Sequence, residues 1–174
     1  MTTLSGDRSP APAVAALSLV AGGPPPLRVR EVTERDLPEL SRLDAEVFGE
    51  HAYPYFVLRQ LYDVYGAHLL VLDDGTSLHG YVLVGTPPDA SRSWILGLGI
   101  AERWRGLGLG RRLMAEALRR LRADGVGEVR LTVEPANSAA IELYESLGFS
   151  HVGCRADYFG PGDDRLVMAL ALMR

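Results

Sequence analysis

The sequence has no lysine, one cysteine and no long apolar run, and each absence excludes a class of protein. With Cys154 alone, the chain can form neither an internal disulfide framework nor a zinc site built on cysteines. Without lysine it contains no Gly-Lys-Ser/Thr sequence, which excludes a P-loop. All 18 basic residues are therefore arginine. The formal net charge of the chain is −4, which argues against nucleic acid as a partner.

The composition is that of a single globular domain. A chain of 174 residues with 47% hydrophobic and 23% charged residues can bury a core without a disulfide or a metal. Residues 1–26 differ from the rest, because they hold five of the eleven prolines and only two charges. We expect them to form a disordered Pro/Ala-rich leader, with residues 27–174 as the domain.

No segment is apolar enough to cross a membrane. The apolar stretch AVAALSLVA in the leader is too short to span a bilayer, and it lacks the positive segment that precedes a signal peptide. We therefore expect a cytoplasmic protein that does not act at a membrane. Whether it is a monomer or a homodimer stays open.

From Leu27 onward, strand patterns alternate with helix patterns. LRVREVT alternates apolar and polar side chains, as a half-buried strand does, and Thr33 is typical of a helix N-cap. The predicted order βααβββαβαββ defines an α/β fold with a mixed sheet of about seven strands and about four helices. We expect strands at 27–33, 67–74, 77–85, 92–100, 127–133, 149–159 and 164–172, and helices at 34–48, 55–65, 107–124 and 137–148.

A glycine-rich turn joins the strand at 92–100 to an arginine-rich helix. It reads Arg105-Gly106-Leu107-Gly108-Leu109-Gly110, followed by Arg111 and Arg112. Glycine lets the backbone approach a ligand closely, and the amides at a helix N-terminus hold phosphate groups. The spacing is not the GxGxxG of dinucleotide-binding folds, and no acid ends a strand about 20 residues later. A tight turn with close helix packing is the other interpretation.

A second motif lies in NSAAIELYESLGF, where Asn137, Ala140, Tyr144 and the pair Gly148-Phe149 stand at fixed intervals. Ala140 and Tyr144 lie four residues apart on one helical face, so the small side chain leaves space beside the phenol. A core aromatic is the alternative interpretation of Tyr144.

Together the two motifs resemble the GNAT superfamily of acetyl-CoA-dependent N-acyltransferases. The first is similar to that family's pyrophosphate loop, Arg/Gln-x-x-Gly-x-Gly/Ala. The second is similar to its Asn-x-x-Ala-x-x-x-Tyr-x-x-x-Gly-Phe signature. The resemblance covers about residues 27–174 and is strongest from 94 to 168. It implies a fold whose central parallel strands splay apart, and direct attack of a primary amine on acetyl-CoA without a metal.

The resemblance also implies a role for each matching residue. Tyr144 would protonate the leaving thiolate, since a phenol of pKa about 10 is protonated at pH 7 and a thiolate of pKa about 8.5 accepts a proton. Asn137 would contact the pantetheine arm. The remaining cofactor contacts would come from the backbone of Leu98, Gly99 and Ile100 toward the pantetheine arm, and from Arg105, Gly106, Leu107, Gly108, Leu109, Gly110 and Arg111 at the pyrophosphate.

Within the superfamily, the sequence is most similar to N-terminal protein acetyltransferases of the ribosomal-protein alanine (RimI-like) type. The likeness lies in LGLGIAERWRGLGLG, NSAAIELYESLGF and DYFGPGDDRLVMAL. Two departures stand out. Thr132 stands where members carry Glu or His, and Trp94 stands where some relatives carry a tyrosine base. The family's catalytic base therefore does not carry over to this chain.

The missing base favours an acceptor of low pKa. At pH 7 an α-amine of pKa about 7.8 is roughly a tenth neutral, whereas a lysine amine of pKa about 10.4 is neutral in about one part in 2,500. We therefore predict a peptide N-terminus as acceptor, with an amino acid, metabolite or antibiotic amine as alternative. Glu134, His151, Tyr158 and water are the candidate bases, and Tyr53, Tyr55 and Phe56 are candidates for the acceptor cleft. A CoA-binding domain without catalysis is a further alternative, against which the presence of Tyr144 counts.

Overall fold

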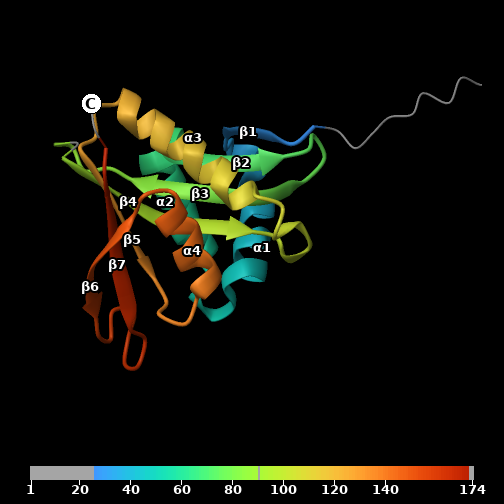
Figure 1. Ribbon diagram of the computed structural model, residues 1–174. Helices are drawn as coiled ribbons and strands as arrows, with labels where there is room; N and C mark the ends of the chain where they lie inside the picture. The colour runs from blue at the N-terminus through green and yellow to red at the C-terminus, as the bar shows by residue number, and fades with distance from the viewer. Residues whose placement is uncertain (1–25, 90, 173–174) are drawn as a thin grey trace, which may run out of the picture.

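The computed structural model describes residues 26–89 and 91–172, so the expected leader lies almost entirely outside the described residues. A seven-stranded mixed sheet forms the centre of the molecule, with strand order β1-β2-β3-β4-β5-β7-β6 (Figure 1). The strands are β1 (Arg28–Glu31), β2 (Leu69–Asp73), β3 (Leu78–Gly85), β4 (Arg92–Ile100), β5 (Glu128–Val133), β6 (Ser150–Arg155) and β7 (Arg165–Ala171). The helices are α1 (Leu37–Phe48), α2 (Tyr55–Tyr65), α3 (Leu109–Ala123) and α4 (Ser138–Ser146), with short 3-10 segments η1 (Glu34–Asp36), η2 (Gly49–His51), η3 (Gly66–His68) and η4 (Glu102–Trp104).

The predicted order βααβββαβαββ and the mixed sheet are confirmed. The element ends differ where a side chain or a glycine intervenes. The first helix is divided, because the Asp36 carboxylate accepts from the backbone N–H of Thr33 (2.7 Å) and from its hydroxyl (2.8 Å), which closes a 3-10 turn before α1. The third helix starts at Leu109 rather than at residue 107, because Gly106 and Gly108 have positive φ angles.

Alternating strand residues build a core on each face of the sheet. Leu70 and Leu72 of β2 point into the core that α3 and α4 cover, whereas Leu69 and Val71 point into the core beneath α1 and α2. The chain therefore forms three layers, with α3 and α4 in front of the sheet and α1 and α2 behind it (Figure 1).

The centre of the sheet opens between β4 and β5. These parallel strands pair only from Arg92 to Ile95, opposite Glu128 to Leu131. Beyond Ile95, β4 pairs with β3 alone, and β5 pairs with β7 up to Val133. A shift in the β3–β4 register leaves Leu96 as an extra residue at this point, which is a β-bulge. The expected splaying of the central strands is confirmed, and one edge of 96–100 is left without a strand partner.

Candidate active site

The glycine loop leads from the open edge of β4 into α3. Gly106 and Gly108 have φ angles of 75° and 73°, a conformation that costs other residues about 1–2 kcal/mol. A Cβ atom built on either glycine meets no heavy atom within 4 Å. The glycines are therefore needed for the course of the backbone and not for packing, and the space outside the loop is free for a ligand.

The amides of this loop form an anion-binding surface. The first backbone bond of α3 runs from Arg112 N to Gly108 O (3.1 Å). None of the amides of residues 106–111 donates a hydrogen bond to another described residue. Unpaired N–H groups and the positive end of the helix dipole together attract phosphate. The residues present thus fit a pyrophosphate group.

Two arginines of the motif hold the loop in place. The Arg105 Nε donates to the Ile100 carbonyl (3.1 Å), which ties the loop to the end of β4. The Arg111 guanidinium donates to the Ser146 hydroxyl (2.6 Å) at the end of α4.

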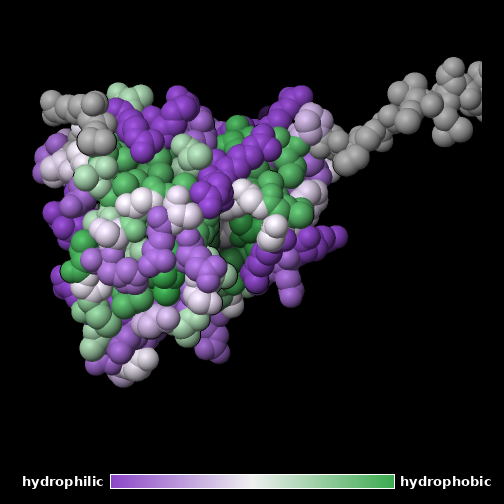
Figure 2. Space-filling view, in the orientation of Figure 1, coloured by the Kyte–Doolittle hydropathy of each residue, from purple (hydrophilic) through white to green (hydrophobic). Residues whose placement is uncertain are grey.

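Figure 2 shows a hollow between α4 and the N-terminal end of α3, and the surface in the depth of this hollow is apolar.

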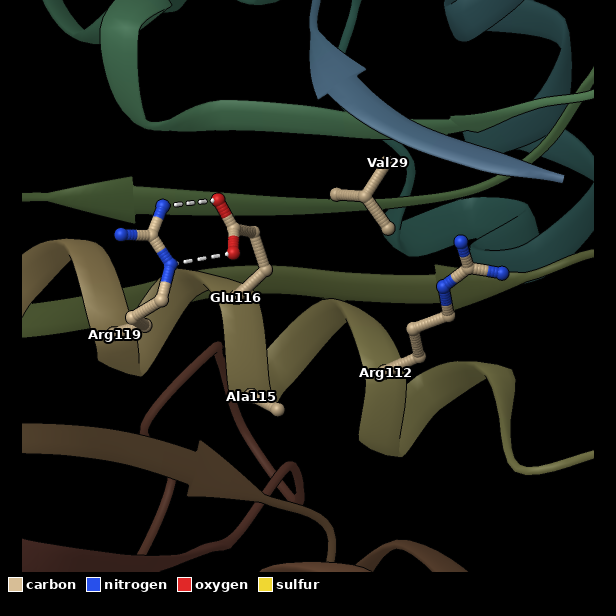
Figure 3. A pocket seen from close by; sticks show the side chains of 5 residues that line it. All are labelled: Val29, Arg112, Ala115, Glu116 and Arg119. Atoms are coloured by element: carbon tan, nitrogen blue, oxygen red, sulfur yellow. Dashed lines mark hydrogen bonds and ion pairs between the residues drawn. The ribbon is translucent and has the colours of Figure 1, made fainter.

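Arg112 points the other way. Its guanidinium donates to the Leu27 carbonyl (2.7 Å), beside β1. There it lines a separate hollow with Val29 and Glu116, and Arg119 on the same wall is held by Glu116 at 2.7 and 2.8 Å (Figure 3). The Arg112 side chain is therefore directed toward β1 and not toward the glycine loop.

Tyr144 lies in α4 and is buried. Its ring is 7% exposed and lies 5.9 Å from that of Phe149. Burial raises the pKa of Tyr144 to about 12, so the phenol keeps its proton at neutral pH. The hydroxyl makes no hydrogen bond to a described residue. Every fully buried side-chain N or O atom of the described residues has a hydrogen-bond partner, so the Tyr144 oxygen is not fully buried. The phenolic oxygen therefore reaches open space and can donate.

Asn137 is the N-cap of α4. Its Oδ1 accepts from the Ala140 backbone N–H (3.1 Å). This bond fixes the side chain and leaves its amide N–H₂ group as a donor. Gly148, with φ of 95°, follows the last turn of the helix and leads into Phe149.

Trp94 and Thr132, which stand where the family resemblance places a base, lie on the face of the sheet opposite to Tyr144. Trp94 on β4 and Thr132 on β5 alternate with Ile95 and Leu131, whose side chains belong to the same core cluster as Tyr144. Both side chains are half-buried. The splayed strands thus have the Tyr144 phenol on one face and Thr132 and Trp94 on the other.

The three candidate bases lie on different segments of the chain. Glu134 is exposed just after β5, where its carbonyl accepts from Asn137 N. His151 lies on the edge strand β6, and its Nε2 is 3.1 Å from Glu145 Oε1. Tyr158 is 42% exposed in the β6–β7 loop and contacts Phe159 edge to face.

Of the aromatic candidates for the acceptor cleft, the Tyr53 hydroxyl donates to the Leu96 carbonyl (3.1 Å) at the bulge. Tyr55 and Phe56 of α2 are 50% and 66% exposed. Only Tyr53 is thus fixed to β4 by a hydrogen bond.

Sequence reasoning missed one residue near the bulge. Asp44 is fully buried in α1, although no cationic side chain pairs with it among the described residues. A signal was present: Leu37, Leu40 and Asp44 fall at helical spacing, so the acid occupies the apolar face of the helix.

The comparisons with known proteins agree with this geometry. Residues 29–149 match the acetyltransferase (GNAT) family. The chain is 30% identical over 139 residues to the N-alpha-acetyltransferase RimI of Mycobacterium tuberculosis, which covers 77% of this chain and 85% of the relative. It is 45% identical over 67 residues to a mycothiol acetyltransferase of Nocardiopsis dassonvillei, covering 38% of this chain but 20% of the relative.

A crystal structure has the same fold. The ribosomal-protein-S18-alanine N-acetyltransferase of Escherichia coli superposes with a TM-score of 0.74 at 22% identity, covering 85% of this chain and 95% of that one. The chain therefore belongs to the acetyltransferase (GNAT) family. It is an N-acetyltransferase that uses acetyl-CoA as acetyl donor and an amine as acceptor.

The described part of the chain has neither a metal-binding cluster nor a membrane-spanning helix. No group of three or more His, Cys, Asp and Glu side chains there could hold a metal ion. None of its helices is long and apolar enough to cross a membrane.

Proposed function

We propose that the protein acetylates the α-amine of a peptide or protein N-terminus. The observation that carries the site is the row of unpaired amides from 106 to 111 beside the open edge of β4. In this arrangement the pyrophosphate of acetyl-CoA binds the amides, and the pantetheine arm runs along Leu98, Gly99 and Ile100 toward the bulge, with Asn137 as a further contact.

The two faces of the splayed strands divide the chemistry. The neutral amine approaches from the face of Thr132 and Trp94, and its nitrogen attacks the acetyl carbonyl carbon. As the C–N bond forms, the C–S bond breaks, and the Tyr144 phenol donates its proton to the thiolate of CoA. The proton lost by the amine nitrogen passes to water.

The absence of a base at Thr132 and Trp94 favours the α-amine as acceptor. Neither Thr132 nor Trp94 accepts a proton near neutral pH, so the enzyme depends on amines that are already partly neutral. The similarity to the M. tuberculosis relative, which is named an N-alpha-acetyltransferase, supports the same acceptor.

One assay tests the proposal. The protein is incubated with acetyl-CoA and a peptide library in which each free N-terminal peptide has an N-blocked partner that carries an internal lysine. We expect the mass of one acetyl group to appear on the free N-termini. A library that stays unmodified, or one modified only on lysine, would contradict the proposal.

A small-molecule amine is the second candidate acceptor. The segment shared with a mycothiol acetyltransferase is more similar, at 45% identity, than the longer match to the N-alpha-acetyltransferase. Amino sugars and amino acids therefore belong in the same assay, and acetylation of these alone would favour the second candidate.

A further inference from the structure

A buried carboxyl group lies behind the open segment of β4. The side chain of Asp44 in α1 is fully buried, and its Oδ2 accepts from the Tyr53 backbone N–H (2.6 Å). Its Oδ1 accepts from the hydroxyl of Tyr81, which is itself fully buried in β3. Asp44 thus joins α1, the segment before α2 and the centre of the sheet.

Both tyrosines of this network contact β4 where it leaves β5. The Tyr53 hydroxyl donates to the carbonyl of Leu96, the bulged residue. The Tyr81 ring lies against the two glycines that follow the bulge: a Cβ at Gly97 would come within 2.9 Å of the Tyr81 hydroxyl, and one at Gly99 within 3.1 Å of its ring. The two glycines are therefore required for the ring to lie flat against the strand.

A buried carboxyl without a cationic partner is costly unless it is well hydrogen-bonded, so it needs a reason. Burial raises the pKa of Asp44, and the hydrogen bonds from Tyr81 and Tyr53 partly oppose that shift. Burial also raises the pKa of Tyr81 well above its ordinary value, so its phenol stays a donor.

We propose that Asp44 is a positioning residue for acetyl transfer. Through Tyr53 and Tyr81 it fixes the bulge at Leu96 and the strand that follows, and thereby sets where the acetyl group lies relative to the amine and to Tyr144. This inference rests on the cofactor placement proposed above. Asp44 cannot touch the reactants, because its side chain is fully buried.

Two substitutions at Asp44 separate position from charge. Asp44→Ala removes both acceptors and is expected to lower kcat about 10²-fold, the cost of a misplacement on the order of 1 Å, while Kd for CoA changes less than about threefold. Asp44→Asn keeps the shape: its amide oxygen accepts from Tyr53 N–H, and its amide N–H₂ donates to a Tyr81 hydroxyl turned round. We expect it to retain kcat within about fivefold, with an unchanged pH profile.

Two further variants complete the experiment. Tyr53→Phe removes only the bond to Leu96, near the surface, and should lower kcat about tenfold with little change in Tm. Glu39→Ala is the matched control, because Glu39 lies on the same helix and accepts from the Leu78 backbone N–H (2.9 Å) away from the bulge. It should lower Tm and leave kcat unchanged. If Asp44→Ala does not fold, Asp44→Asn and Tyr53→Phe decide.

Each kcat is compared with that of the wild type on whichever acceptor the wild type acetylates best. A preference for lysine or a small amine would then overturn the proposed function and leave this test intact. If Asp44→Ala and Tyr53→Phe keep full kcat and lose only Tm, as Glu39→Ala should, the network is merely structural. If Asp44→Asn is as inactive as Asp44→Ala and its pH profile changes, Asp44 takes a proton and the positioning role is wrong.

Discussion

The imidazole of His79 stacks on the indole of Trp104, with ring centroids 4.1 Å apart and planes inclined by 30°. Trp104 immediately precedes Arg105, the first residue of the glycine loop. The His79 Nε2 is in turn 2.6 Å from Asp74 Oδ2, whose partner oxygen accepts from the turn between β2 and β3. The turn between β2 and β3 therefore supports the glycine loop through Asp74, His79 and Trp104.

This contact predicts an effect on cofactor affinity at a distance from the cofactor. Aromatic stacking contributes about 0.5–1.5 kcal/mol, so His79→Ala should raise Kd for CoA about 2- to 10-fold by loosening the loop. Calorimetric titration measures the change. His68→Ala is the control, because His68 pairs with Asp124 (3.3 Å) at the far end of α3. Equal Kd values for the two variants would show that the stack does not position the loop.

The glycine loop allows a matched pair of substitutions. Gly108 and Gly125 flank α3, have φ angles of 73° and 76°, and face open space. Glutamate at either position should cost about 1–2 kcal/mol of folding free energy through the left-handed backbone. Only Gly108→Glu should abolish binding of CoA, because its carboxylate would lie at the pyrophosphate site. If both variants bind CoA normally, the pyrophosphate is held elsewhere.

The order of the elements could be predicted because its signals are local. Asn137 caps α4 through an amide three residues away, and the alternation in β5 needs no knowledge of its partners. The bulge at Leu96 could not be predicted, because it is defined by the register of β4 on β3. The partners of Asp44 lie 9 and 37 residues along the chain, so only the folded chain shows why an acid occupies an apolar face.

Tyr144→Phe should affect the rate and not the fold. The hydroxyl makes no hydrogen bond to a described residue, so its removal leaves Tm and Kd for CoA nearly unchanged, whereas loss of the general acid should lower kcat about 10²-fold. Because burial raises the pKa of Tyr144 to about 12, the phenol should not lose its proton between pH 7 and 10 in kcat profiles. A variant with full kcat, under conditions where chemistry limits the rate, would reduce Tyr144 to a packing residue.

Low pH should weaken the ion pair between Arg30 of β1 and Asp36, which immediately precedes α1. The hydrogen bond from Arg30 to Asp36 lowers the pKa of Asp36 to about 2, although partial burial opposes the shift. A lowered pKa means that the stabilisation is complete above the ordinary pKa and is lost as the pH falls toward 2. Asp36→Asn should therefore be less stable than the wild type at pH 7, and the difference should shrink between pH 4 and 2. Denaturant unfolding at each pH measures it, and a constant difference would contradict the assignment.

If the protein supplies no base, the acceptor preference should depend on pH. Thr132 and Trp94 stand where the resemblance to the family places a base, and neither accepts a proton near neutral pH, so we expect the enzyme to depend on amines that are already partly neutral. In a matched peptide pair, one with a free α-amine and one N-blocked with an internal lysine, the α-amine should be favoured in kcat/KM by at least about tenfold at pH 7. That advantage should shrink toward about pH 9, because the neutral fraction of the α-amine saturates while that of lysine still rises. A clear preference for lysine at pH 7 would mean that the protein supplies a base, and Glu134 and Tyr158 would be the first residues to replace.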